Sequence, residues 1–80
     1  MAFKNIGKLI KENRLKVGLT QNELSLAMGY SKGQFISNVE RGTCSIPNYQ
    51  IPVVAKKLKV SKREIKEALV ADFSESLGKW

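Results

Sequence analysis

Four polar residues at helical spacing are the part of this sequence best suited to recognition chemistry. They are spaced i, i+3, i+4 and i+7, so a helix would place them on one face: Gln34, Ser37, Asn38 and Arg41. The set holds two carboxamides, a hydroxyl and a guanidinium, and no acid. A carboxamide donates and accepts together, which matches the N6 and N7 edge of adenine in the major groove of DNA. The alternative is a merely solvated face, although such a face more often carries Lys and Glu.

Catalytic and metal chemistry is disfavoured by the side chains available. The 80 residues include no His and a single Cys, Cys44, and the carboxylates are not clustered. A metal site or a nucleophile–base pair needs such groups close together. We therefore expect no enzymatic activity, no metal and no cofactor. Cys44 is expected to be an inert loop thiol, with a reactive thiol as the alternative.

The charge of the chain is unevenly distributed. The net charge is +7, and residues 1–66 carry 13 Lys and Arg against 4 acids, whereas residues 67–80 carry 1 Lys against 3 acids. A basic body indicates an anionic partner such as nucleic acid, or solubility alone.

The sequence gives no sign of export or of a membrane. A single cysteine excludes an internal disulfide and is typical of a reducing compartment. No apolar run approaches the roughly 20 residues needed to span a bilayer, and no secretory signal is visible. We expect a cytoplasmic, nucleoid-associated protein with no membrane partner and no small-molecule ligand.

The recognition set falls within residues 20–42, a stretch typical of two short helices joined by a tight turn. A capping box marks a helix start: a Ser or Thr hydroxyl accepts from a free backbone N–H, and the Glu or Gln three residues later reaches back. Gly29 and Gly42 are expected to end the two helices, because glycine takes a positive φ without a Cβ clash. Two capped helices across one turn favour a helix-turn-helix. The boxes in the chain pair Thr20 with Glu23, Ser31 with Gln34, and Ser61 with Glu64.

Gln34 cannot serve both of the roles assigned to it. A capping box with Ser31 would occupy the side chain, so base reading by Gln34 requires that the helix begin later. Gly33 weakens a helix by about 1 kcal/mol relative to Ala, which favours either that later start or a close approach of the backbone to DNA. Tyr30 and Phe35 are expected to pack together as a hydrophobic staple.

Apolar residues at helical spacing predict how the first three helices pack. The first helix, over residues 4–17, is basic and amphipathic; packing inside a bundle is favoured over lying on a membrane surface. Ser25 is small enough for a close helix crossing. The residues expected to face inward are Ile6, Leu9, Ile10 and Val17 in the first helix, Leu24, Ala27 and Met28 in the second, and Phe35, Ile36 and Val39 in the third.

Two further helices follow a loop over residues 43–50. Pro52 lacks an N–H and fits the first turn of a helix that begins near Ile51. The last helix is expected to run to about Leu77, where Gly78 ends it. With no strand signal, the chain is predicted to be all-α. The predicted organisation is a single domain over residues 1–80, with a core at 4–70 and a helical extension at 71–80.

Three stretches together resemble the Cro and phage-repressor (XRE-like) helix-turn-helix family, which includes restriction–modification controller proteins. They are Gly18-Leu19-Thr20-Gln21-x-Glu23-Leu24, then Gly29, then Ile36-Ser37-Asn38-Val39-Glu40-Arg41-Gly42. The resemblance covers about residues 6–70. It implies a compact five-helix, lambda-repressor-like domain with the helix-turn-helix at helices two and three, here with an extended fifth helix. It also implies binding of double-stranded DNA as a homodimer.

The resemblance implies a role for individual residues. Arg14 and Glu40 match an internal structural ion pair. The segment from Gly29 to Gly42 is one residue longer than is common in the family, and the extra residue falls near Gly33. Base-reading positions match Gln34, Asn38, Ser37 and Lys32, and phosphate-contact positions match Gln21, Arg41, Thr43, Gly33 and Asn48.

The expected function is therefore a sequence-specific transcriptional regulator, a repressor or an activator, that binds a palindromic operator as a homodimer. Dimer contacts are expected from Phe73, Leu77 and Trp80, with packing on the domain's own core as the alternative. A different class of function also remains open. An antitoxin or protein-interaction module would use the C-terminal helix from Glu67 onward to bind a partner protein.

Overall fold

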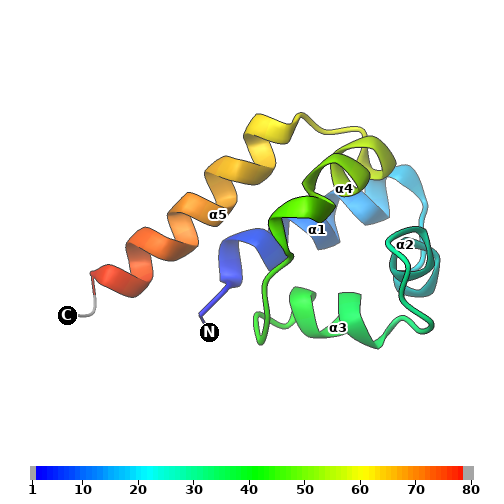
Figure 1. Cartoon of the computed structure of the whole chain (residues 1–80), viewed down its shortest axis with the longest axis horizontal. Helices are drawn as coiled ribbons and strands as arrows, with labels where there is room; N and C mark the ends of the chain where they lie inside the picture. Colours follow the sequence, from blue (N-terminus) through cyan, green and yellow to red (C-terminus); the bar gives the residue numbers. More distant parts are fainter. Residues whose placement is uncertain (1, 79–80) are drawn as a thin grey trace.

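Five α-helices make up most of residues 2–78, the part of the chain that this computed structural model describes (Figure 1). The helices are α1 (Lys4–Val17), α2 (Gln21–Ala27), α3 (Gln34–Glu40), α4 (Ile51–Leu58) and α5 (Lys62–Leu77), with a short 3₁₀ helix, η1 (Asn48–Gln50), before α4. The described residues form no strand, and the prediction of an all-α fold is confirmed. None of the described helices has both the length and the apolar character that crossing a membrane requires.

Local capping explains several of the helix boundaries. Thr20 Oγ1 accepts from the Glu23 backbone N–H at 3.0 Å, while Glu23 Oε1 accepts from the Thr20 N–H at 2.9 Å. Ser61 forms the equivalent capping box at the start of α5. Gly29 has φ 92° and Gly42 has φ 80°, the left-handed values expected of glycines that end helices.

The predicted capping box of Ser31 with Gln34 is wrong. α3 begins only at Gln34, its N-cap is Gly33, and no side chain caps it. Residues 28–33 connect α2 to α3, so Gln34 is the first helical residue of α3. Its side chain reaches along α3 and is free of the capping role.

The core lies where all five helices meet. α3 crosses α1 closely at Gly7, which has no Cβ. A Cβ at this position would lie only 2.5 Å from the carbonyl oxygen of Val39. Side chains that are fully buried come from every helix: Ile6, Ile10, Leu24, Ile36, Val39, Val54 and Ile65.

One expected core position in α2 is wrong. Ala27 is exposed, and Ser25 is fully buried instead. The hydroxyl of Ser25 accepts from the backbone N–H of Ile36 at 3.3 Å, so its polar atom is satisfied inside the bundle. The small side chain of Ser25 thus allows α2 and α3 to pack closely, and its hydrogen bond to Ile36 links the two helices.

The two ends of the described chain are joined by Asp72. Its carboxylate is buried and accepts from the backbone N–H groups of Asn5, at 2.8 Å, and of Ile6, at 3.0 Å. α1 has no side-chain cap of its own at Phe3, so α5 supplies the acceptor from the other end of the sequence.

α5 continues past the body of the domain (Figure 1). Ile65 in its first half is fully buried, whereas Val70, Phe73 and Leu77 are 62%, 63% and 55% exposed. Phe73 and Leu77 therefore do not fold back on the domain's own core. Trp80, the third residue expected at a dimer contact, lies outside the described residues.

Candidate nucleic-acid interface

An ion pair fixes α3 against α1. Arg14 Nε lies 2.6 Å from Glu40 Oε2, and Arg14 Nη2 donates to Glu40 Oε1 at 3.2 Å. The two side chains are only 10% and 4% exposed. Arg14 Nη1 also donates to the carbonyl of Leu19 at 2.8 Å, which attaches the turn before α2. The bidentate geometry and burial make this pair a structural lock rather than a surface feature.

Gln21 extends the lock to α2. Its Nε2 donates to Glu40 Oε1 at 3.0 Å, so one carboxylate receives donors from both α1 and α2. Gln21 is half-buried at the start of α2, and its carboxamide oxygen is not needed for this bond. The residue thus braces α3, and it retains an acceptor and an N–H for a ligand.

The outward face of α3 carries a hydrogen-bonded chain of three side chains. Gln34 Nε2 donates to Asn38 Oδ1 at 2.9 Å, and Arg41 Nη2 donates to the same oxygen at close range. Gln34 and Arg41 are exposed and Asn38 is half-buried. Of the candidate base-reading and phosphate-binding residues, the structure joins the side chains of these three by direct hydrogen bonds.

The other two base-reading candidates, Ser37 and Lys32, are not part of this set of hydrogen-bonded side chains. Ser37 is half-buried within α3, and Lys32 is exposed on the turn that precedes it. Glu40, the acid of α3, is held by Arg14. The hydrogen-bonded chain of α3 thus combines two carboxamides with a cation, and the helix's own acid is already neutralised.

Gly33 is explained by a steric contact inside the protein. A Cβ at this position would lie 3.0 Å from the backbone nitrogen of Asn22 and 3.3 Å from the carbonyl carbon of Gln21. The missing side chain lets the start of α3 approach the start of α2. Its role as a phosphate contact stays a prediction.

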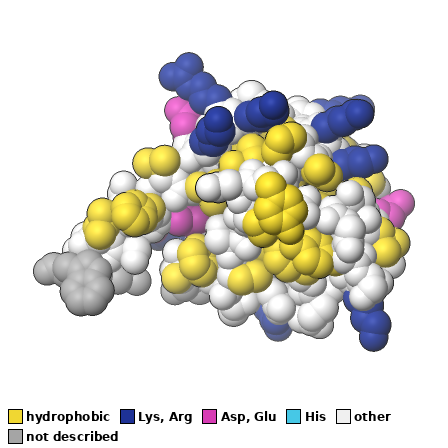
Figure 2. Space-filling view, in the orientation of Figure 1, with side chains coloured by type: hydrophobic (Ala, Val, Ile, Leu, Met, Phe, Trp, Pro, Cys, Tyr) yellow, Lys and Arg dark blue, Asp and Glu magenta, His cyan; other side chains and the backbone are white. Residues whose placement is uncertain are grey.

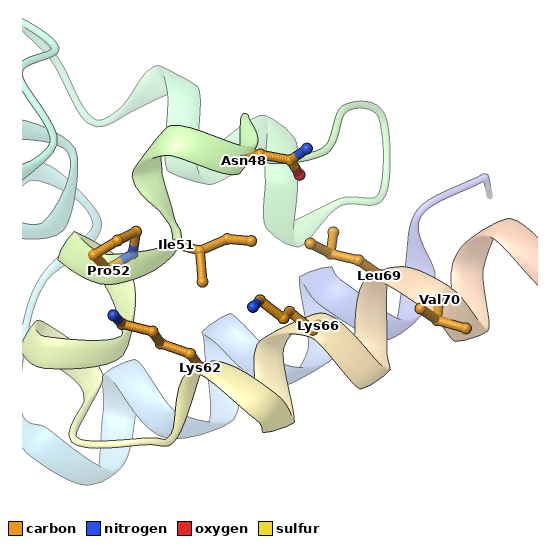
Figure 3. Close-up of a pocket in the computed structure, with 7 residues that line it drawn as sticks. All are labelled: Asn48, Ile51, Pro52, Lys62, Lys66, Leu69 and Val70. Atoms are coloured by element: carbon orange, nitrogen blue, oxygen red, sulfur yellow. The ribbon is translucent and has the colours of Figure 1, made fainter.

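Thr43 and Asn48 lie after α3, so helical spacing does not predict what their side chains contact. The Thr43 hydroxyl and backbone N–H both donate to the carbonyl of Asn38, at 2.9 and 3.1 Å, so Thr43 closes the C-terminal end of α3. Asn48 lines a groove of about 580 Å³ between α4 and α5, together with Lys62 and Lys66 (Figure 3). Their phosphate contacts also remain predictions.

Sequence reasoning missed two polar residues that support the motif. Gln50 is buried, and its Nε2 donates to the carbonyl of Met28 at 2.8 Å, which ties η1 to the end of α2. Asp72 caps α1. Asp72 lies i+7 from Ile65, the register that faces the bundle, and this spacing was the available signal.

The titratable groups near the motif have simple environments. The Thr20 backbone N–H, donating to the Glu23 carboxylate, lowers its pKa below 4.5. Burial raises the pKa of the Cys44 thiol above 9.0, which disfavours the reactive thiolate. Partial burial raises the pKa of Tyr30 above 10.0, with Tyr49 a further cause, and its ring stacks on Phe35 with centroids 4.1 Å apart. No group of three His, Cys, Asp or Glu suited to a metal occurs in residues 2–78.

Comparison with known proteins finds a similar fold among solved structures. No family model and no curated protein sequence matches the chain. Among solved structures, it is similar to the crystal structure of the wild-type restriction–modification controller protein C.Esp1396I, with a TM-score of 0.66 and 25% sequence identity. The match covers 91% of this chain and 92% of that one. The expected resemblance to helix-turn-helix regulators of the controller type is thereby confirmed, as is the five-helix fold.

Proposed function

We propose that this protein is a transcriptional regulator that binds double-stranded DNA with α3 in the major groove. The observation that carries the proposal is the chain Gln34–Asn38–Arg41 on the outward face of α3. An α-helix with its side chains is about 10–12 Å across, so α3 fits a major groove about 12 Å wide.

Some side chains of the motif would determine the DNA sequence that is bound, and others would contribute affinity for any duplex. Gln34 and Asn38, with Ser37 beside them, would read base edges, because carboxamides pair with adenine. Arg41, Gln21 and the tip of α3 would contact phosphates, which set register and affinity. Asn38 Oδ1 already accepts from two donors, so base reading would exchange one of these bonds for a base N–H. In the free protein, these hydrogen bonds would thus hold the side chains of Gln34 and Asn38 in place before DNA binds.

Two copies would bind a palindromic operator. Half-sites about one helical turn, or 34 Å, apart would match two α3 helices related by a two-fold axis. The dimer surface would be the outward stripe of α5, Val70, Phe73 and Leu77, because three large apolar side chains lie exposed there in series. Such a regulator would act in the cytoplasm, at the nucleoid. The structural likeness to a controller protein supports a regulatory role.

The test is selection from a random duplex library at about 0.15 M salt, where specific complexes are distinguished from non-specific ones. The expected result is an enriched, two-fold symmetric sequence with half-sites one turn apart. A bound pool with no enriched sequence would contradict the proposal.

The exposed stripe of α5 also fits a second function, a protein-interaction module whose α5 binds a partner such as a toxin. Sedimentation of the full chain and of F73E/L77E separates the two. A dimer that dissociates in the variant supports the regulator. A chain that is monomeric in both forms, and that selects no DNA, favours the interaction module. Truncation after Val70 is a poorer test, because it also removes the Asp72 cap of α1.

A further inference from the structure

Most of the positive charge of this protein lies away from α3. Six cations occur within residues 56–66, and all six are exposed. By contrast, α3 and the turn before it carry only Lys32 and Arg41. We call this basic surface, at the end of α4 and the start of α5, the α4–α5 corner: Lys56, Lys57, Lys59, Lys62, Arg63 and Lys66.

The corner lies on the opposite side of the bundle from α3. α3 runs along the lower edge of Figure 1, and the turn from α4 to α5 is at the upper edge. Lys and Arg side chains gather along that upper edge in Figure 2, and few appear along the lower edge. Figure 3 shows Lys62 and Lys66 reaching from α5 toward α4. A duplex held by α3 would therefore leave the corner facing away from it.

Nearby acids neutralise the corner only in part, because residues 56–67 carry six cations against Glu64 and Glu67, a net charge of +4. The carboxylate of Glu64 accepts from the backbone N–H of Ser61 in the capping box. Glu67 is 3.8 Å from Arg63, but the two side chains are 68% and 87% exposed, so the pair is weak.

Folding explains the cations of this corner only in part: Lys56 and Lys57 lie in the last turn of α4, where the helix dipole favours positive charge, but the next three do not fit their local structure. Lys62 and Arg63 lie in the first turn of α5, where the helix dipole disfavours positive charge. Lys59 has φ 56°, a left-handed conformation that glycine or asparagine would adopt more readily. Local stability alone would select other residues at all three positions, which points to a ligand that rewards the charge.

We infer that the α4–α5 corner binds the phosphate backbone of a second DNA duplex, without reading its sequence. Clustered ammonium and guanidinium groups displace condensed counterions from DNA, and this supplies sequence-independent affinity. The inference rests on the proposed function, in which α3 holds the first duplex. One protein would then bridge two DNA segments: the operator through α3, and any neighbouring segment through the corner.

The experiment measures capture of a second duplex by the protein on its operator. The selected operator duplex is immobilised and saturated with protein, and a fluorescent duplex of unrelated sequence is added at low salt. The test variant is K56Q/K57Q/K59Q, and the charge-matched control is K8Q/K11Q/K16Q, which removes three exposed lysines from α1. K56R/K57R/K59R tests rescue by charge alone, and circular dichroism checks that each variant is folded. If the test variant does not fold, K62Q/K66Q replaces it.

We expect the wild type, the control and the arginine variant to capture the second duplex. In K56Q/K57Q/K59Q, capture should fall about 10-fold or more, and its dependence on log salt should flatten by about 2 to 3, near 0.9 for each lost phosphate contact. Occupancy of the operator should be unchanged. Equal capture by test and control variants would overturn the inference. So would a wild type that binds the operator but captures no second duplex, or a corner that binds anionic vesicles or polyglutamate in preference to DNA.

The two proposals can fail separately. If the library yields no operator, while random duplexes still bind and lose affinity in K56Q/K57Q/K59Q, the proposed function fails and the corner stands. If the operator is selected and held, but no second duplex is captured, the corner fails and the proposed function stands.

Discussion

The carboxamide of Gln34 donates a hydrogen bond of 2.9 Å to Oδ1 of Asn38, one turn further along α3. This bond is possible because α3 begins at Gln34, which leaves that side chain free of the capping box with Ser31. The late helix start thus resolves the conflict between capping and recognition. Each residue of the pair restricts the rotamers of the other, which would reduce the entropy lost in the proposed binding of a base edge.

Replacing Asn38 by Ala should relax specificity at one base-pair position. A bidentate carboxamide–adenine contact contributes about 1–3 kcal/mol of discrimination, and the variant should lose it. The measurement is competition between the selected operator and its single-base-pair variants. Equal weakening on the operator and on random duplex would instead assign Asn38 to positioning.

Replacing Arg41 by Ala should weaken binding to every duplex alike. Removal of one phosphate contact reduces the slope of log affinity against log salt by about 1. Titration of operator and random duplex over a range of salt concentrations measures that slope. An unchanged slope, or a loss confined to the operator, would count against a phosphate contact.

Replacing Glu40 by Gln should destabilise the whole domain. The change leaves the buried Arg14 without its charged partner, and breaking a buried pair in this way costs about 3–5 kcal/mol. Urea unfolding followed by circular dichroism gives the free energy. E67Q, in the exposed pair with Arg63, is the control and should change it by less than about 1 kcal/mol. Similar values for both variants would contradict the lock between α1 and α3.

Replacing Gly33 by Ala should push α3 away from α2. The new Cβ would lie 3.0 to 3.1 Å from backbone atoms of Asn22, which cannot move as a side chain can. Overpacking of this kind costs about 1–3 kcal/mol, measured again by urea unfolding. G78A is the matched control, since its Cβ would meet atoms only at 3.5 Å and beyond. A G33A protein as stable as the wild type would mean that the contact relaxes easily.

Replacing Glu23 by Gln should reduce stability at neutral pH but not in acid. The Thr20 N–H lowers the pKa of Glu23 in the folded protein, so the ionised form stabilises the fold above the unfolded pKa of about 4.5. That contribution is lost as the pH falls through the lower, folded pKa. The difference in melting temperature between wild type and E23Q should therefore be present at pH 6 to 7 and vanish near pH 3. A difference independent of pH would show that the carboxylate charge is not involved.

Local signals predicted the helices well, because caps and periodicity involve residues close in sequence. The capping boxes at Thr20 and Ser61 are present, and α5 ends at Leu77 as expected. The box at Ser31 did not form because residues 31–33 lie in the turn before α3, whose N-cap is Gly33 rather than Ser31. The spacing of apolar residues predicts Ala27 inward, whereas the structure buries Ser25, whose hydroxyl accepts from the backbone N–H of Ile36 across the helix crossing.

The candidate site was predictable only in part. Its outward residues follow from spacing along a single helix, so Gln34, Asn38 and Arg41 could be grouped from the sequence. Their mutual hydrogen bonds depend on rotamers, and the supporting bond from Gln50 to Met28 spans 22 residues. No local pattern specifies such contacts, since they exist only after the helices have packed.

The carboxylate of Asp72 connects residues that are 66 and 67 positions apart. During synthesis α1 leaves the ribosome first, but its leading amides cannot be capped by Asp72 until α5 has followed. A nascent chain that ends before Asp72 thus lacks the contact that closes the bundle. The bundle should therefore become fully folded only after α5 has left the ribosome, and not when the helix-turn-helix alone has emerged.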